Sequence, residues 1–395
     1  MAVDVQVEEI KGLVSSPIRY SVRSFHRGDY ISRPMKIDPA LATRLAPWGF
    51  DNTQLDGFIE RVAQASTGNA VTGTLTPPTP QDVRALPAPG TDEHRRLAKL
   101  GKEAIAARKV GVVILAGGMA TRFGGVVKAV VPVLEDRTFL KLKLDDVRQA
   151  GADVPVYVMS SFATHERLLQ HVKELSAKHV EVFPQFISLR LTPEGQLFKE
   201  DDGDVSPYAT GHGDLTFALR KSGLLAKFRA AGGTMLMMSN VDNLGATLDP
   251  AVIGAHLERG VALSAEVVRK AKGDKGGAPA RLNGSPQIIE GFRFPAAFDQ
   301  DSIPVFNTNT FVMEAAAIDR DFSLPFYKVE KKVGGATAVQ FERLVGELTA
   351  FLPSTFLEVP REGVESRFLP AKDPEELASR LSTIRLVAES KRSAR

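Results

Sequence analysis

A continuous apolar run constrains the fold of this chain more than any other feature. Residues 110–116 read Val-Gly-Val-Val-Ile-Leu-Ala, with no polar side chain among them. A half-buried strand alternates apolar and polar residues, whereas an uninterrupted apolar run indicates a strand buried on both faces. Strands of this kind occur in parallel sheets that are covered on both sides by helices. The run therefore predicts an α/β protein.

The residues that follow alternate between strand patterns and helix patterns. A helix is expected over 138–150, with Gly151 as its stop, and another after Thr164, which we expect to be its N-cap. Strands alternating with helices predict a Rossmann-like, mixed and mostly parallel sheet flanked by helices. In such sheets, ligands bind at the carboxyl ends of the strands. Further strands are expected over 154–160, 180–183, 235–238, 262–268 and 305–313.

The chain divides into three predicted regions. Residues 1–108 form a mostly helical N-terminal segment with a proline-rich connector, in which short helices are expected over 39–45 and 53–65 and a charged helix over 92–108. Proline excludes the connector from helices and central strands. Residues 109–372 form the catalytic domain, and residues 373–395 form a C-terminal helix and a basic tail.

Composition excludes several classes of protein. None of the 395 residues is cysteine, so disulfides, thiolate nucleophiles and thiolate metal sites are excluded. A net charge of +3 without a clustered basic stripe does not indicate a nucleic-acid partner. The acidic first 11 residues lack the pattern of a secretory signal, and no apolar stretch reaches the length of a membrane helix. We therefore expect a cytoplasmic protein without a membrane partner.

A glycine-rich segment follows the first apolar run. Residues 115–125 read Leu-Ala-Gly-Gly-Met-Ala-Thr-Arg-Phe-Gly-Gly, and Lys128 and Pro132 come next. Glycines allow backbone N–H groups to turn toward a bound anion, and Arg122 and Lys128 add positive charge. The segment matches neither the P-loop nor the dinucleotide fingerprint. A plain glycine-rich turn with two surface cations is the alternative interpretation.

The same segment resembles the signature of sugar-nucleotide pyrophosphorylases, Leu-x-Gly-Gly-x-Gly-Thr-Arg followed by Lys-x-x-x-Pro. From Val110 to about Asp373 the chain is similar to the UDP-glucose pyrophosphorylase branch of that family. The resemblance implies a nucleotide-diphospho-sugar transferase fold of the GT-A-like type, and the short C-terminus predicts no β-helix domain there. Other segments follow in the family's order, at 162–166, 211–214, 239–249, 275–277, 306–309, 339–342 and 367–370.

Asp242 is the candidate metal ligand. It stands just past the apolar run 235–238, where a ligand group is expected. A carboxylate there suits Mg²⁺, which takes oxygen ligands and bridges substrate phosphates. An isolated aspartate at this position would more often cap a turn, but the resemblance implies the metal role.

The resemblance also implies a set of substrate-binding residues. Gln185 would read the uracil edge, where an amide offers both a donor and an acceptor. His212 would approach the sugar phosphate, and Glu290 would accept hydrogen bonds from sugar hydroxyls. An ordinary strand-end role for Gln185 and a sheet-edge role for Asn307 are the structural alternatives. The full set is Ala116, Gly117, Gly118, Gln185, Gly211, His212, Gly213, Asn240, Glu290, Gly291, Asn307 and Asn309.

The reaction implied is UTP plus glucose 1-phosphate giving UDP-glucose and pyrophosphate, by in-line attack of the sugar phosphate on the α-phosphorus. Arg122 and Lys128 would hold the departing phosphates, and a lysine from the group 328–332 would contact the transferred phosphate. Spacing favours Lys332, with Lys331 second. The partners implied are small molecules, UTP and the sugar 1-phosphate, with Mg²⁺ as cofactor.

Three alternatives remain open. The same reaction on N-acetylglucosamine 1-phosphate or on several sugar 1-phosphates differs only in the sugar pocket. A non-catalytic UDP-sugar or UTP sensor is supported by Ala120 and Val127, which replace a glycine and a proline of the family pattern. A dinucleotide-dependent oxidoreductase fits worse, because its fingerprint is missing. The oligomeric state stays open, a monomer included.

Overall fold

The structure is a computed structural model that describes residues 37–64, 68–271, 274 and 276–393. Four sequence expectations fall wholly or partly outside this range, among them the end of the helix expected over 53–65. The other three concern the acidic N-terminal start, Lys275 of the 275–277 motif, and the end of the basic tail.

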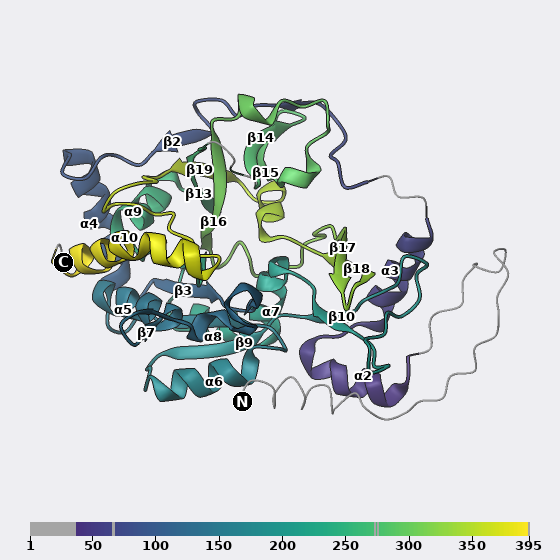
Figure 1. The fold of residues 1–395 in the computed structure, drawn as a ribbon. Coiled ribbons are helices and arrows are strands. Elements are labelled where there is room, and N and C mark those ends of the chain that lie inside the picture. Colours follow the sequence, from purple (N-terminus) through teal and green to yellow (C-terminus); the bar gives the residue numbers. More distant parts are fainter. Residues whose placement is uncertain (1–36, 65–67, 272–273, 275, 394–395) are drawn as a thin grey trace, which may run out of the picture.

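An eight-stranded sheet forms the centre of the molecule (Figure 1), with the strand order β2-β19-β13-β16-β12-β3-β8-β9. Neighbouring strands pair in parallel except at β16, which is antiparallel to both β12 and β13. This confirms the predicted mixed, mostly parallel sheet. The strands are β2 (Val83–Ala85), β3 (Val110–Leu115), β8 (Val156–Ser160), β9 (Val180–Pro184), β12 (Met235–Asn240), β13 (Leu263–Arg269), β16 (Val305–Glu314) and β19 (Ser354–Glu358).

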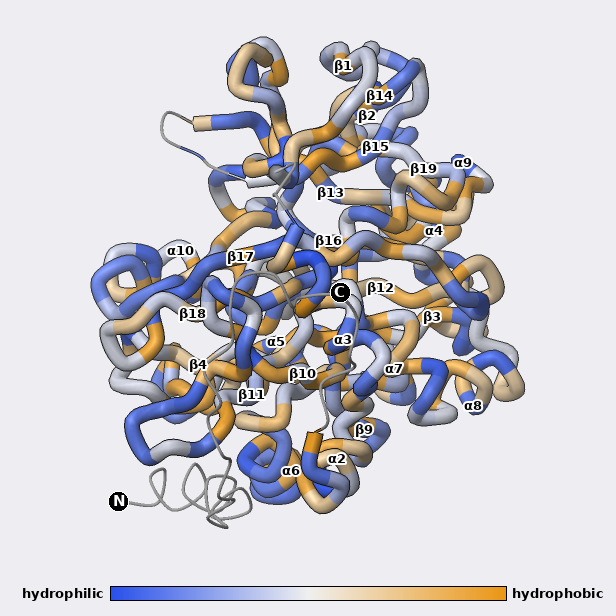
Figure 2. Tube along the Cα trace, turned by 90° about the vertical axis from the view of Figure 1, so that its right-hand side faces the viewer, coloured by the Kyte–Doolittle hydropathy of each residue, from blue (hydrophilic) through white to orange (hydrophobic). Residues whose placement is uncertain are grey.

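Two apolar clusters lie on opposite faces of this sheet. All six residues of β3 are buried, with Val112 and Ile114 in one cluster and Val113 and Leu115 in the other. Figure 2 shows apolar residues gathered along the central strands β12 and β13. Helices on the first face are α4 (Asp92–Ala106), α5 (Phe139–Ala150), α6 (His165–Glu174), α9 (Pro250–Arg259) and α10 (Pro374–Ser393). Helices on the second face are α7 (Leu215–Lys221) and α8 (Leu224–Ala230).

Helix α5 ends at Ala150 with Gly151 directly after it, as predicted, and its N-cap is Thr138. Thr138 caps α5 as its hydroxyl accepts a hydrogen bond from the Lys141 N–H at 3.2 Å. Thr164 stands directly before α6 but makes no capping hydrogen bond, so this expectation is wrong. Its hydroxyl instead accepts from the Ser161 N–H at 2.9 Å, because the turn after β8 folds back on it.

The N-terminal helices α2 (Pro39–Leu45) and α3 (Asn52–Ala63) cover a separate hairpin made of β17 (Tyr327–Val333) and β18 (Ala336–Glu342). Phe58 stacks on Phe341 with ring centroids 4.5 Å apart. Figure 1 shows this group beside β10 and away from α4 and α9. The smaller strands are β1 (Leu75–Thr76), β10 (Ile187–Leu189), β11 (Pro207–Ala209), β14 (Ala278–Leu282) and β15 (Ser285–Ile289), and a further hairpin pairs β6 (Pro132–Leu134) with β7 (Arg137–Thr138).

Residues before 109 also contribute to the main sheet. Strand β2 pairs with β19 at its edge, which suits a segment between prolines, and α4 packs against α9. The boundary after residue 108 stays a prediction. Within the described part of the chain, every helix falls short of the length and apolarity required to cross a membrane.

Helices α4 and α9 meet through two glycines. A Cβ added to Gly101 would lie 1.8 Å from the Pro250 carbonyl oxygen, and one on Gly254 would lie 1.9 Å from the Leu97 carbonyl oxygen. Backbone atoms cannot move aside as a flexible side chain can. The contact therefore requires glycine on both helices.

We expect Gly101→Ala to lower the free energy of unfolding by about 3 kcal/mol, because the methyl group would force the two helix backbones apart. Gly57→Ala is the matched control, since Gly57 lies inside α3 with open space around it. That change should stabilise the protein by about 0.5–1 kcal/mol through helix propensity. Urea unfolding measures both, and equal effects of the two substitutions would contradict the backbone contact.

Candidate active site

The carboxyl ends of β3 and β12 lie side by side and place two sequence motifs together. The strands pair in parallel with Leu115 opposite Asn240, and the Val241 N–H donates to the Leu115 carbonyl at 3.0 Å. The glycine-rich loop begins directly after β3, and Asp242 follows directly after β12. The carboxyl edge at which ligands are expected therefore carries both motifs.

The glycine-rich loop is a small hairpin that folds back on itself. Strand β4 (Met119–Ala120) pairs with β5 (Val126–Val127), and Gly124 and Gly125 make the turn with φ of 84° and 80°. These values lie in the left-handed region that favours glycine. The Lys128 N–H then donates to the Gly118 carbonyl at 3.3 Å. The hairpin thus returns Lys128 to the start of the loop.

Lys128 and Asp242 are in direct contact. The Lys128 Nζ lies 2.6 Å from Asp242 Oδ2, and the two side chains are only 14% and 21% exposed. Arg122 lies elsewhere: its side chain is 65% exposed and 3.8 Å from the Asp373 carboxylate. The structure therefore brings two of the three predicted charged residues together and leaves Arg122 at the rim.

The residues around Asp242 fit a Mg²⁺ ion held largely by substrate. Among the described residues, no three His, Cys, Asp or Glu side chains gather into a metal-binding group. Mg²⁺ is commonly bound by one or two carboxylates together with water and substrate phosphates. The Asp242 carboxylate would supply one such oxygen ligand, and Mg²⁺ would then compete with the Lys128 ammonium for it.

Gln185 lies against the glycine-rich loop. A Cβ on Gly117 would lie 2.7 Å from the Gln185 side-chain nitrogen, so a larger residue there would displace the Gln185 amide. The Gln185 N–H donates to the Ser160 carbonyl at the end of β8. A cavity of about 430 Å³ opens beside the same loop, lined among others by Gly117, Met119, Thr121, Gly125, Ser161, Phe162, Arg190, Asp202 and Tyr208.

The loop 211–214 is held by a buried ion pair that sequence reasoning missed. The Arg343 guanidinium lies 2.5 Å from Asp214, and the two side chains are 8% and 0% exposed. Gly211, with φ of 100°, lies so close to Arg343 that a Cβ would be 2.5 Å from its carbonyl oxygen. The available signal was Arg343 directly after the strand 336–342, beside Glu342.

His212 is neutral in this setting. Its Nδ1 accepts a hydrogen bond from the Val345 N–H at 3.1 Å, which leaves the ring proton on Nε2. Burial lowers the pKa of His212 to about 4. His212 can therefore donate a hydrogen bond at neutral pH but carries no positive charge.

The candidate asparagines form a chain that leads to the Asp242 loop. Pairing between β13 and β16 is irregular at Glu266, and Asn309 adopts a φ of 57° there. The Asn309 side chain donates to Asn240 Oδ1 at 3.0 Å, and its N–H donates to Asn307 Oδ1 at 3.1 Å. The Asn307 N–H reaches the Gly277 carbonyl at 2.8 Å.

Glu290 follows β15 and faces two glycines. A Cβ on Gly277 would lie 3.0 Å from its carboxylate, and one on Gly346 would lie 3.3 Å away. Burial, reinforced by the Glu347 carboxylate, raises the pKa of Glu290 to about 7, while Arg293 opposes the shift. Glu347 and Arg293 form a second ion pair, 2.6 Å apart and missed from the sequence. Gly291 lies next to Glu290, against the Gly276 carbonyl.

Lys331 and Lys332 are not gathered with the other candidates. Both lie on β17, and their side chains interact within their own hairpin. The Lys332 Nζ donates to the Thr337 hydroxyl at 2.7 Å, and the Lys331 Nζ lies 3.9 Å from Glu342. The structure shows no contact that selects one of them.

Comparison with known proteins places this geometry in a family. The family described as UTP–glucose-1-phosphate uridylyltransferase matches residues 61–392. The UTP–glucose-1-phosphate uridylyltransferase 2 of Dictyostelium discoideum is 30% identical over 297 residues, which are 69% of this chain and 58% of that protein. The enzyme of that name from Hordeum vulgare is 28% identical over 81% of this chain and 72% of its own length.

Solved structures show the same fold. A UDP-N-acetylglucosamine pyrophosphorylase from Trypanosoma brucei, in complex with an inhibitor, matches with a TM-score of 0.72 and 19% identity over 87% of this chain and 79% of its own. A mutant UDP-glucose pyrophosphorylase from Leishmania major, in complex with UDP-glucose, matches with a TM-score of 0.66 and 22% identity over 85% of this chain and 77% of its own.

The match extends over most of this chain but over less of some relatives. It spans 58% of the Dictyostelium protein and 56% of the relative from Encephalitozoon cuniculi. The family match nevertheless covers the glycine-rich loop, the Asp242 loop and every other candidate residue. The chain belongs to the UTP–glucose-1-phosphate uridylyltransferase family.

Proposed function

We propose that this protein is a Mg²⁺-dependent uridylyltransferase that joins glucose 1-phosphate to UTP and releases pyrophosphate. The contact between Lys128 and Asp242, at the common edge of β3 and β12, carries the proposal. Family membership and the 430 Å³ cavity beside the glycine-rich loop support it. The absence of cysteine supports a cytoplasmic setting.

The charged residues would act on the departing phosphates. The sugar phosphate is itself an ionised nucleophile, so the protein needs only to align it and stabilise charge. Loop N–H groups and Lys128 would hold the β- and γ-phosphates, with Arg122 at the rim. Asp242 would hold Mg²⁺, which supplies positive charge that bridges the phosphates.

The other polar candidate residues would select the substrates. The Gln185 amide would read the uracil edge, and the neutral His212 would donate through Nε2 to the sugar phosphate. Glu290, Asn307 and Asn309 would bind sugar hydroxyls. Lys332 or Lys331, which lie on β17, would neutralise the sugar phosphate.

The same reaction on N-acetylglucosamine 1-phosphate is the second candidate. Its support is the fold likeness to the protein from Trypanosoma brucei that is named a UDP-N-acetylglucosamine pyrophosphorylase. Similarity of fold at 19% identity does not show which sugar the pocket accepts, so an assay has to identify the sugar.

Pyrophosphate release from UTP with a panel of sugar 1-phosphates tests the proposal. We expect release with glucose 1-phosphate to exceed that with the other sugars. Lys128→Ala should lower kcat by roughly 10²–10³, the effect of losing one preorganised charge contact. Asp242→Ala should lose the Mg²⁺-dependent activity. Lys227→Ala is the control, because Lys227 pairs with Glu181 on the protein surface and should leave kcat unchanged.

Each result has a distinct meaning. Preference for another sugar keeps the reaction and changes the substrate. Wild-type kcat in Lys128→Ala would contradict the phosphate-binding role of Lys128. UTP or UDP-sugar binding without turnover on any sugar would favour the sensor.

The pKa of Glu290 predicts a pH-dependent affinity for UDP-glucose. Sugar hydroxyls donate to the ionised carboxylate, so binding should tighten as pH rises through about 7. Between pH 6 and 8 the wild-type Kd should fall by about tenfold, as one linked deprotonation requires. The pKa of His212, about 4, keeps that residue neutral throughout this range.

Isothermal titration with UDP-glucose measures this effect, because the diphosphate does not change charge in this range. Glu290→Gln should bind with a Kd that does not vary with pH, since its amide cannot ionise. A parallel pH dependence in the wild type and the variant would show that Glu290 does not bind the sugar as a carboxylate.

A further inference from the structure

Helix α5 carries a buried lysine on the face that packs against the sheet. The Lys143 side chain is 4% exposed and lies between the apolar positions Leu140 and Val147. Its ammonium donates to the Ser239 hydroxyl at 2.8 Å, to the Asn243 carbonyl at 3.3 Å and to the Ala246 carbonyl. One side chain thus bonds to three residues of a single segment.

That segment carries Asp242. Ser239 precedes Asp242 by three residues, and Asn243 follows it directly. On its other side the segment is bound to the chain near residue 367. The Asn243 amide donates to the Arg367 carbonyl at 3.1 Å and accepts from the Leu369 N–H at 2.8 Å. The Asp242 loop is therefore clamped between α5 and residues 367–369.

A charged residue at this buried position is unfavourable in free energy unless it is well partnered. Burying an ammonium group costs free energy unless its donors are partnered, and a leucine would cover the same helix face without that cost. The partners of Lys143 include two carbonyl groups that a loop needs satisfied when it leaves a strand. The charge therefore fixes the path of the loop backbone and does more than fill the core.

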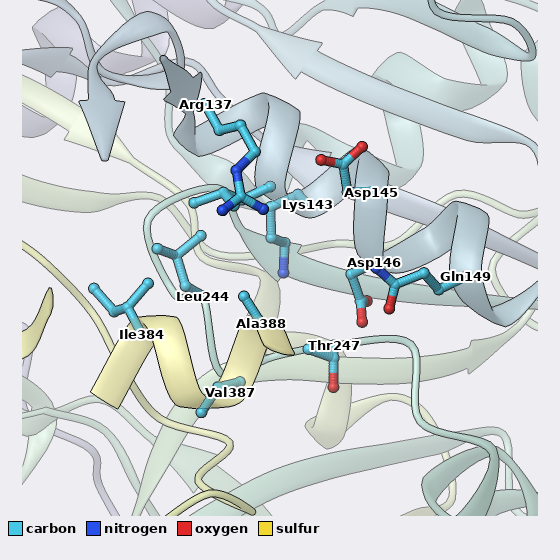
Figure 3. A pocket seen from close by; sticks show the side chains of 11 residues that line it. Arg137, Lys143, Asp145, Asp146, Gln149, Leu244, Thr247, Ile384, Val387 and Ala388 are labelled. Carbon is cyan, nitrogen blue, oxygen red and sulfur yellow. The ribbon is translucent and has the colours of Figure 1, made fainter. Parts of the chain in front are cut away.

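Helix α10 encloses this lysine. Figure 3 shows the Lys143 side chain extending from α5 toward Ala388 of α10, and Ile384 and Val387 of α10 line the same pocket. A small cavity of about 30 Å³ remains beside it, with room for one water-sized group. Lys143 and its hydrogen bonds are thus shielded from solvent on the side of α10.

We propose that Lys143 is a positioning residue that holds the Asp242 loop in the geometry required to bind Mg²⁺ together with UTP. The proposal rests on the proposed function and adds a residue that touches neither substrate nor metal. Loss of Lys143 should weaken the contribution of Mg²⁺ to UTP binding, whereas a purely structural role would lower only the stability.

Isothermal titration of UTP, in Mg²⁺ and in EDTA, separates these roles. For Lys143→Met we expect the Mg²⁺-dependent gain in UTP affinity to fall at least tenfold, with the affinity in EDTA unchanged. Val147→Ala, one turn along the same buried helix face, is the stability control and should keep the wild-type gain despite a lower Tm. A full gain in Lys143→Met would overturn the proposal.

Two further variants keep the test decisive if Lys143→Met folds poorly. Ser239→Ala removes the hydroxyl that accepts from Lys143 and should show a smaller loss in the same direction. Lys143→Arg should restore part of the gain, because a guanidinium keeps the positive charge and N–H donors that face the loop. Two results together would count against the clamp. Ser239→Ala would keep the wild-type Mg²⁺-dependent gain, and Lys143→Arg would show no larger gain than Lys143→Met. A wild type without any Mg²⁺-dependent gain would instead refute the metal role of Asp242, and with it this inference.

Discussion

Parallel pairing of β3 with β12 is the constraint on which the site depends. Because both strands run in one direction and pair with Leu115 opposite Asn240, the loops that leave them begin side by side. The glycine-rich loop and Asp242 therefore lie close together directly after their strands. Apolar clusters on both faces fix the two strands, so the register cannot slip without exposing buried side chains.

Buried charged side chains hold the loops that carry the candidate site residues. Asp214 and Arg343 fix the loop 211–214, Glu347 and Arg293 lie behind Glu290, and Lys143 clamps the Asp242 loop. Buried ion pairs contribute little net stability, because desolvation offsets their attraction. Their effect here is geometric, since each one fixes the backbone path of a loop that carries a candidate site residue.

Sequence patterns predicted the regular elements well, and the candidate site in part. The run 110–116 indicated a buried strand since a continuous apolar segment has no wet face. The glycine loop was singled out because glycines and charge at a strand end suit an anion, whereas the resemblance to the family singled out Asp242 as a metal ligand. The capping hydrogen bond of Thr164 was predicted wrongly. Its hydroxyl can accept from several nearby N–H groups, and the turn after β8 brings the Ser161 N–H within reach.

The sequence by itself determined the α/β class, six of the eight strands of the main sheet, and the residue types that follow β3 and β12, because these follow from local periodicity and short motifs. Tertiary structure alone decided that β16 runs antiparallel, that Arg122 turns toward Asp373, and that Lys143 reaches the Asp242 loop. These outcomes depend on contacts between residues far apart along the chain. No short window of sequence contains both partners of such a contact.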